Sequence, residues 1–270
     1  MSGQRQGDDM EKELVLYEER DGTGLVTLNR PRALNALGPD MLVRLSQVLD
    51  RAAKDVSVRA VIITGSGDKA FSAGADIGCL SLATPLEARD LARLAVSVNR
   101  KIETSGKLAV AAINGFALGG GLELAEACAL RVAAPHASLG HPEVAIGAVA
   151  GWGGTTRLPR LVGRGRAAEL LLTGRRVTAE EALAMGLVNR VSRSRETLLE
   201  EARALVEEVL SRAPLSVAMT WEAMRRGLDM TAEESAALGA DLFGLIASTE
   251  DFREGTRAFL EKRKPRFKGR

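Results

Sequence analysis

Aromatic residues and cysteines are scarce in this 270-residue sequence: aromatic side chains make up 3% of it, and there are two cysteines. Cys79 and Cys128 are too few for a disulfide framework, and neither lies at the Cys/Cys or Cys/His spacing of a zinc site. We therefore expect no metal centre and a reduced, cytoplasmic setting.

An excess of charge of either sign is also lacking, because 37 basic residues face 35 acidic ones, a net charge of +2. Such a chain has no overall field that would recruit nucleic acid or an anionic membrane. Residues 1–12 are polar and lack the apolar core of a signal peptide, so we expect a flexible N-terminal lead-in. The 46% of hydrophobic residues suffices for one sizeable core.

The first half of the chain alternates between strand-like and helix-like patterns. Two β-rich runs flank Asp21-Gly22, a strong hairpin signal. Later strand-like runs end in glycine, and helical spacing of apolar residues separates them. This order predicts an α/β core. The expected strands are 13–19, 23–30, 58–65 and 108–115, and the expected helices are 38–55 and 85–104.

The second half begins with residues 142–163, which are rich in glycine and proline and predict a long irregular loop. Helical spacing returns at 164–173 and 178–186, and from Arg195 to about Lys262 the chain is almost wholly helical, with N-cap signals at Thr231 and Thr249. We therefore divide the chain near residue 200 into an α/β core, 13–200, and a helical region, 201–270. The apolar helices of that region predict burial against another subunit.

The longest apolar stretch, residues 108–134, is broken by Gly119, Gly120 and Gly121. Together with Asn114 and Glu123 these glycines argue against a membrane span. Glycines between a strand and a helix leave backbone N–H groups directed outward at the positive end of the helix dipole, which suits an anion or an oxyanion. A glycine turn that allows close packing of helix and strand is an equally good interpretation.

Two carboxylates have apolar neighbours. Glu123, in the first turn of the predicted helix, is either a favourable residue for the helix dipole or an acid–base group with a pKa raised by burial. Glu126 lies one turn later, and residue spacing does not rank the two. Glu143 is either a solvated turn residue or the second member of a general acid–base pair.

Other candidate groups are weaker. His136 and His141 have no nucleophile or metal ligand at a usable spacing, so we expect structural roles for both. Ser72 lacks the first glycine of a hydrolase nucleophile elbow, because Ala70 stands at that position.

Several motifs together resemble the enoyl-CoA hydratase/isomerase (crotonase) superfamily over nearly the whole chain from about Leu14. They are NRPRALNAL (29–37), FSAGADI (71–77), INGFALGGGLELA (113–125), PEVAIGAVAGWGGTTRLPRLVG (142–163) and AFLEKRKPRFKG (258–269). The resemblance implies a spiral of repeated ββα units and a C-terminal helical trimerisation region. It also implies assembly as a homo-trimer or a dimer of trimers.

The resemblance assigns roles to individual positions. The backbone N–H groups of Ala75 and Gly120 would form an oxyanion hole, and Glu123 and Glu143 would be the two catalytic acids, which favours Glu123 over Glu126. Glu123 would activate the water, and a protonated Glu143 would deliver a proton to C2. Residues that would bind the coenzyme A part of the substrate are Arg32, Ala33, Ala73, Phe243, Phe259 and Lys262.

The activity implied by the resemblance is hydration of a trans-2-enoyl-CoA thioester to a 3-hydroxyacyl-CoA, in fatty-acid or related acyl-CoA catabolism. No cofactor is implied, since coenzyme A is part of the substrate. One alternative is isomerisation of a 3-enoyl to a 2-enoyl thioester, or another enolate chemistry. Another is an RNA-binding homologue that recognises AU-rich RNA; the basic tail RKPRFKGR favours it, but the net charge near zero does not.

This chain departs from the family pattern at several positions. A lysine that often contacts phosphate is replaced by Gly78, and the usual proline before the GxGGT motif is replaced by Ala150. Trp152 occupies the variable position of that motif, so we expect an acyl pocket of different shape near Glu143. Glu126 replaces a smaller residue, and the residue pattern offers no physical reason for it.

Overall fold

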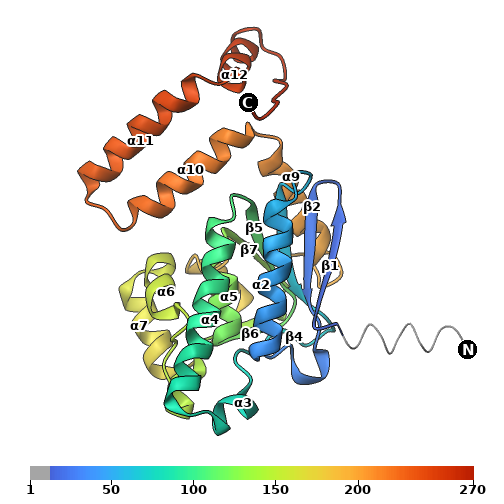
Figure 1. The fold of residues 1–270 in the computed structure, drawn as a ribbon, viewed down its shortest axis with the longest axis vertical. Helices are drawn as coiled ribbons and strands as arrows, with labels where there is room; N and C mark the ends of the chain where they lie inside the picture. The colour runs from blue at the N-terminus through green and yellow to red at the C-terminus, as the bar shows by residue number, and fades with distance from the viewer. Residues whose placement is uncertain (1–12) are drawn as a thin grey trace, which may run out of the picture. The chain divides into compact units, whose positions relative to one another are not determined.

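The computed structural model describes residues 13–270, so the predicted lead-in, 1–12, lies outside the described residues. The chain forms two compact units that divide between Arg203 and Ala204. Figure 1 shows the course of the chain through both.

The first two strands of the described residues form the predicted hairpin. Strands β1 (Val15–Arg20) and β2 (Thr23–Leu28) pair antiparallel, and Asp21 and Gly22 join them with φ angles of 53° and 75°. Two consecutive residues with positive φ suit the twist of a tight hairpin, and an Asp-Gly pair adopts them readily.

The first unit contains a six-stranded sheet in the order β1-β2-β3-β5-β7-β10 and a four-stranded sheet in the order β4-β6-β8-β9. Along the chain, a strand of the six-stranded sheet is followed by a short strand of the four-stranded sheet, and this succession repeats for β3 and β4, β5 and β6, and β7 and β8. The α/β class and the spiral of ββα units are thereby confirmed. The remaining strands are β3 (Ala60–Gly65), β4 (Ala70–Ser72), β5 (Leu108–Ile113), β6 (Phe116–Leu118), β7 (Leu130–Ala133), β8 (Ser138–Gly140), β9 (Arg176–Thr178) and β10 (Arg190–Val191).

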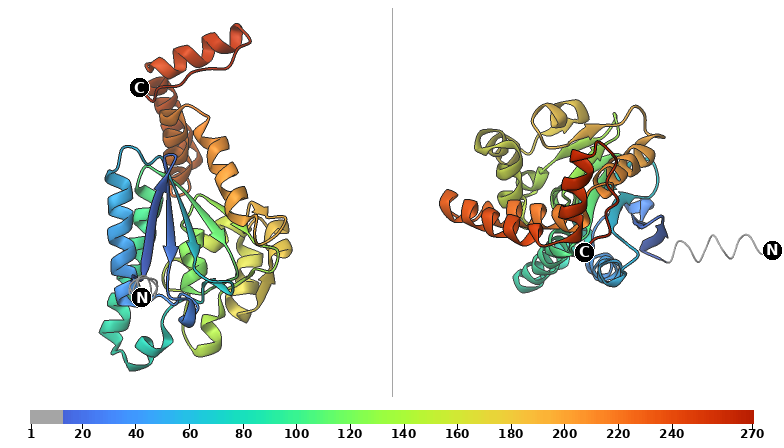
Figure 2. Two further views of the ribbon diagram at one scale, coloured as in Figure 1. Left: turned by 90° about the vertical axis from the view of Figure 1, so that its right-hand side faces the viewer. Right: turned by 90° about the horizontal axis from the view of Figure 1, so that it is seen from above.

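Two long helices cover one side of the six-stranded sheet. Helix α2 (Pro39–Lys54) and helix α4 (Pro85–Thr104) pack against each other, and α2 also packs on β1 and β2 (Figures 1 and 2). The apolar residues of α2 recur at helical spacing and are buried, as the sequence predicts. The shorter elements are η1 (Pro31–Ala33), α3 (Ile77–Leu82), α5 (Gly120–Glu126), η2 (Pro142–Ile146), α6 (Gly154–Val162), α7 (Arg164–Thr173), α8 (Ala179–Ala184) and α9 (Leu198–Leu210).

Two local features differ from the sequence-based expectation. The segments that follow the glycine ends of the predicted strands each contain a short strand, β4 or β6, of the second sheet, which the sequence did not indicate. The irregular loop predicted over 142–163 contains η2 and, from Gly154, helix α6, so that prediction was wrong. Pro159 lies inside α6, and a proline within a segment is normally a signal that the segment is not a helix.

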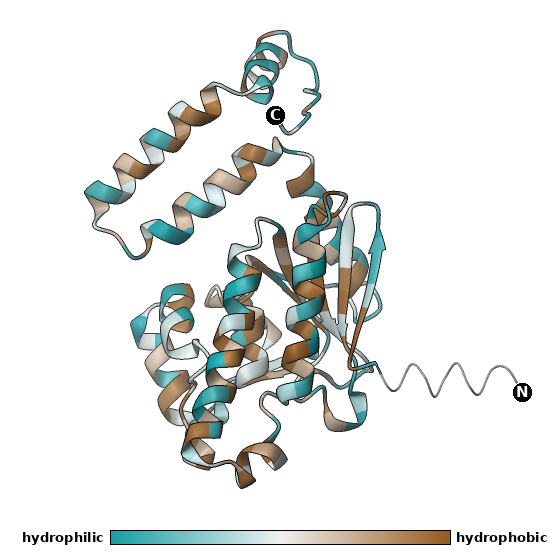
Figure 3. Cartoon of the chain, in the orientation of Figure 1, coloured by the Kyte–Doolittle hydropathy of each residue, from teal (hydrophilic) through white to brown (hydrophobic). Residues whose placement is uncertain are grey.

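The second unit contains three helices after α9: α10 (Pro214–Gly227), α11 (Ala232–Ala247) and α12 (Glu250–Leu260). Thr231 forms a capping box with Glu234 before α11, and Thr249 caps α12, as predicted. Neither α10 nor α11 has a buried residue, and both carry apolar bands (Figure 3). Large exposed apolar side chains here include Met224, Leu228, Phe243 and Leu245.

Residues 13–270 include no helix that combines the length and the apolar character needed to cross a membrane.

Candidate active site

The triple glycine lies where β6 ends and α5 begins, and all seven residues of α5 are buried. A Cβ on Gly120 would lie 2.4 Å from the Trp152 ring, and one on Gly121 would lie 2.3 Å from the Ser72 carbonyl oxygen. Close packing therefore requires these glycines. The packing interpretation and the anion-site interpretation do not exclude each other, since the first N–H groups of α5 have no partner within their own helix.

The loop after β4 meets the start of α5. A Cβ added to Gly74, at φ 97°, would lie 2.6 Å from the Leu118 oxygen and 3.2 Å from the Gly120 nitrogen. Leu37 and Ala75 form an isolated parallel β-bridge, in which the Leu37 N–H donates to the Gly74 carbonyl and the Asp76 N–H donates to the Leu37 carbonyl. The Ala75 N–H takes no part in this bridge and points away from Leu37. Ala75, in the loop after β4, thus lies beside the start of α5, where Gly120 is the first residue.

Side-chain hydrogen bonds hold the loop that carries Ala75. The Ser72 hydroxyl donates to the Asn35 carbonyl at 2.9 Å and accepts the Gly74 N–H at 3.2 Å, so it is engaged in holding the loop. The Ala73 N–H donates to the Leu34 carbonyl at 2.9 Å. This bond brings Ala73 beside η1, which contains Arg32 and Ala33, so the structure brings together these three predicted coenzyme A contacts.

Glu123 is buried, with 1% of its surface exposed. Its Oε1 accepts two backbone N–H groups, from Trp152 and Gly154, each at 2.7 Å. Burial raises the pKa of Glu123 to about 7, and the Gly154 hydrogen bond opposes the shift only in part. Glu123 therefore gains and loses a proton near neutral pH, which is the range in which a general acid or base is effective.

This raised pKa gives a stability prediction. The native state keeps the Glu123 proton between pH 4.5 and 7, where the unfolded chain has lost it, so stability should fall as pH rises through this window. In Glu123→Gln, which has no ionisation, the free energy of unfolding relative to wild type should rise by about 3 kcal/mol between pH 4.5 and 8. Urea unfolding at both pH values measures it, with Glu180→Gln, at an exposed position in α8, as the control. An equal difference at both pH values would contradict the assignment.

Glu143 lies in η2, and its charge raises the pKa of Glu123. A Cβ added to Gly119 would lie 3.0 Å from Glu143 Oε1, so the carboxylate lies against the triple glycine. Among the described residues neither Glu143 oxygen has a hydrogen-bond partner. The alternative that this acid is a solvated turn residue does not hold, since 14% of its side chain is exposed.

Glu126 and His141 were not expected to interact. His141 Nε2 lies 2.9 Å from Glu126 Oε1 with both side chains fully buried, and His141 Nδ1 lies 3.6 Å from Glu143 Oε1. Residue spacing gave no indication of this partner for His141. His136, by contrast, is exposed. The signal in the sequence was the unexplained acid at position 126 in an apolar helix, since a buried acid needs a partner.

The remaining predicted contacts lie in the second unit. Phe243 on α11 stacks edge-on against Phe252 with 6.0 Å between ring centres, and it is mostly exposed. Phe259 on α12 is 83% exposed, and Lys262, at φ 55°, follows the end of that helix.

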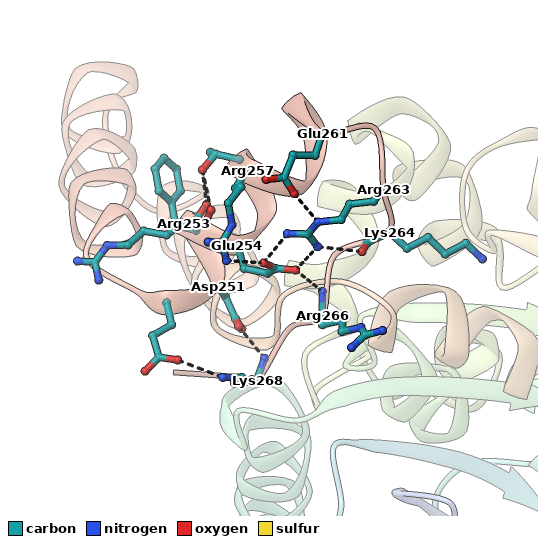
Figure 4. Close-up of polar contacts among 12 residues, drawn as sticks. Asp251, Arg253, Glu254, Arg257, Glu261, Arg263, Lys264, Arg266 and Lys268 are labelled. Carbon is teal, nitrogen blue, oxygen red and sulfur yellow. Dashed lines mark hydrogen bonds and ion pairs between the residues drawn. The ribbon is translucent and has the colours of Figure 1, made fainter.

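The C-terminal tail folds back along α12 (Figure 4). Buried Asp251 accepts the N–H groups of Lys268 and Gly269 at 2.6 and 2.8 Å. Arg263 pairs with both Glu254 and Glu261, and these arginine contacts lower the pKa of Glu254. A groove of about 1070 Å³ opens here, lined largely by basic residues that include Arg253, Arg257, Lys264 and Arg266.

Comparison with known proteins identifies the family. The sequence pattern of the family described as Enoyl-CoA hydratase/isomerase matches residues 18–270. The chain is 43% identical to a crotonyl-CoA hydratase of Syntrophomonas wolfei, over 96% of this chain and 99% of that protein. It is 42% identical to a short-chain-enoyl-CoA hydratase of Clostridium acetobutylicum, over 94% and 97%. The chain therefore belongs to the enoyl-CoA hydratase/isomerase family, the crotonase superfamily.

The fold agrees. The crystal structure of an enoyl-CoA hydratase from Bacillus anthracis superposes with a TM-score of 0.90 at 36% identity, covering 95% of this chain and 100% of that one. The family resemblance read from the motifs is confirmed.

Proposed function

We propose that this protein adds water to a trans-2-enoyl-CoA thioester to give a 3-hydroxyacyl-CoA. The observation that carries the proposal is a pair of carboxylates near the triple glycine, the buried Glu123, whose pKa is about 7, and the half-buried Glu143. A hydratase needs one group that takes a proton from water and one that gives a proton to carbon. The family of hydratases to which the chain belongs supports the same reaction.

In the proposed reaction Glu123 accepts a proton from water while the water oxygen bonds to C3 of the substrate. The electron pair of the C2–C3 double bond moves onto the thioester carbonyl and gives an enolate. The N–H groups of Ala75 and Gly120 stabilise the enolate oxygen, an effect typically worth about 3 to 4 kcal/mol per donor. Glu143 gives its proton to C2, and the proton on Glu123 returns to Glu143 through solvent, so one water is added in balance.

Arg32, Ala33 and Ala73 are proposed to contact the coenzyme A part of the substrate. Phe243, Phe259 and Lys262 are proposed to contact it from a neighbouring subunit. Support comes from the bond that joins Ala73 to the η1 loop and from the exposure of both phenylalanines. No cofactor takes part in the proposed steps. Free Cys79 and Cys128 fit the reduced, cytoplasmic setting that the proposal includes.

A homo-trimer, or a dimer of trimers, is proposed as the assembly. The exposed apolar side chains on α10 and α11 support it, because large exposed apolar patches are typical of protein interfaces. Sedimentation equilibrium should give three or six times the 28.7 kDa mass of the chain. A protein that stays at 28.7 kDa at micromolar concentration would overturn this part of the proposal.

The reaction is tested by identifying the product. Crotonyl-CoA incubated with the protein in D₂O should give 3-hydroxybutyryl-CoA with one deuterium at C2, seen by mass spectrometry and NMR. A 3-enoyl thioester is the matched substrate for the alternative activity. Isomerisation that outpaces hydration would replace the proposed function by the isomerase.

A further inference from the structure

His141 and Glu126 form a buried hydrogen-bonded pair next to the elements that carry the two proposed catalytic acids. Glu126 lies one turn after Glu123 on α5, and His141 directly precedes η2, which carries Glu143. Both side chains of the pair are 0% exposed, and the 2.9 Å separation of His141 Nε2 and Glu126 Oε1 is a hydrogen-bond distance. A pair this deeply buried is expensive to desolvate, and it calls for a role beyond stability.

The other ring nitrogen faces the site. His141 Nδ1 lies 3.6 Å from Glu143 Oε1, and among the described residues neither Nδ1 nor the two Glu143 oxygens has a hydrogen-bond partner. An imidazole can direct N–H groups at carboxylates from both nitrogens only in its charged form. Burial opposes that charge, but the Glu126 charge and hydrogen bond outweigh it and raise the pKa of His141 to about 10.

We propose that His141, held by Glu126, is a positioning residue that keeps the Glu143 carboxyl against Gly119 and places one positive charge among the three glutamates. The inference rests on the proposed hydration, since it assigns His141 a task in that reaction. His141 would not touch the substrate. It would act through Glu143, by donating an N–H to one carboxyl oxygen while the other oxygen carries the proton that goes to C2, and through its charge, which also acts on Glu123.

The surrounding charges decide the expected pH effect. Glu123 and Glu126 act on His141 from α5 and Glu143 from η2. Two arginines act on the same glutamates: Arg131 on β7 acts on Glu126, and Arg157 on α6 acts on Glu126 and Glu123. Arg157 is itself paired with Glu103 of α4 at 2.7 Å. The His141 charge lowers the pKa of Glu123 against the effect of burial, so its loss should raise that pKa further.

The variant His141→Gln keeps a polar side chain and removes the charge. We expect kcat for crotonyl-CoA hydration to fall about 10- to 100-fold with KM nearly unchanged, since a misplacement of 1 Å in a reacting group costs on the order of 100-fold. The acid limb of the pH profile should move up by about one pH unit, the usual effect of losing an opposite charge at this range. His136→Gln, at an exposed position, is the matched control.

Equal kcat and an unmoved acid limb in His141→Gln would overturn the proposal. The ring charge is measured separately in wild-type protein labelled with ¹⁵N-histidine, and His136→Gln assigns the two signals. His141 should be doubly protonated at pH 8 and should titrate near neutral pH in Glu126→Gln. A neutral His141 in wild-type protein at pH 7 would also overturn the proposal, even in an active enzyme. A charged His141 in a protein that hydrates nothing would overturn the proposed function, and with it the task assigned to His141.

Discussion

Replacing Glu123 by glutamine is expected to lower kcat for crotonyl-CoA hydration by about 10²- to 10⁴-fold, the usual contribution of a general acid–base group. The glutamine oxygen can still accept the Trp152 and Gly154 N–H groups, so the fold and substrate binding should survive. Glu143→Gln should lower kcat by a similar factor, because it removes the group that gives a proton to C2.

The matched control for both variants is Glu180→Gln on α8, which should hydrate crotonyl-CoA at the wild-type rate. Initial rates at pH 7.5, with circular dichroism to check folding, give the comparison. If both variants of the pair keep at least half of the wild-type kcat, the two carboxylates are not the acid–base pair.

Adding a methyl group at Gly120 is the second large expected effect. The new Cβ would meet the Trp152 ring at 2.4 Å, and the Trp152 N–H is one of the two donors to Glu123. Gly120→Ala should therefore displace an oxyanion donor and a support of Glu123 together. We expect a fall of about 10²- to 10³-fold in kcat, the usual effect of losing an oxyanion donor. A loss of about 1 to 3 kcal/mol in unfolding free energy should accompany it, as for other overpacked sites.

The control for Gly120→Ala is Gly165→Ala. Gly165 lies in α7, and an added Cβ there meets no atom within 4 Å. This substitution should leave kcat unchanged and should stabilise the protein slightly, because alanine favours a helix over glycine. Thermal unfolding and steady-state kinetics on the two variants measure both effects. Wild-type kcat in Gly120→Ala would contradict the account of the triple glycine.

Much of the fold could be predicted from local patterns. The hairpin at Asp21-Gly22, helix α2 and the cap at Thr231 follow from turn chemistry, apolar spacing and capping residues close in the sequence. The short strands β4 and β6 could not be predicted, because each has only three residues, too few to show a strand pattern, and their pairing partners are far away in the sequence. Helix α6 was missed because Pro159 lies inside it.

The candidate site was predictable in part. Glu123 and Gly120 were visible because polar and glycine residues stand out in an apolar stretch. The partners of Glu123 were not, since the Trp152 and Gly154 N–H groups approach from a segment about thirty residues later. The pair of Glu126 and His141 likewise depends on contact between α5 and the start of η2, which residue spacing does not reveal.

The most direct test of the account is the pH dependence of kcat/KM for crotonyl-CoA hydration by the wild-type protein. Because Glu123 must be ionised to accept a proton from water, and its pKa is about 7, the rate should rise with pH through an acid limb centred near 7. A flat profile between pH 5 and 8, or the absence of hydration across that range, would contradict the central claim.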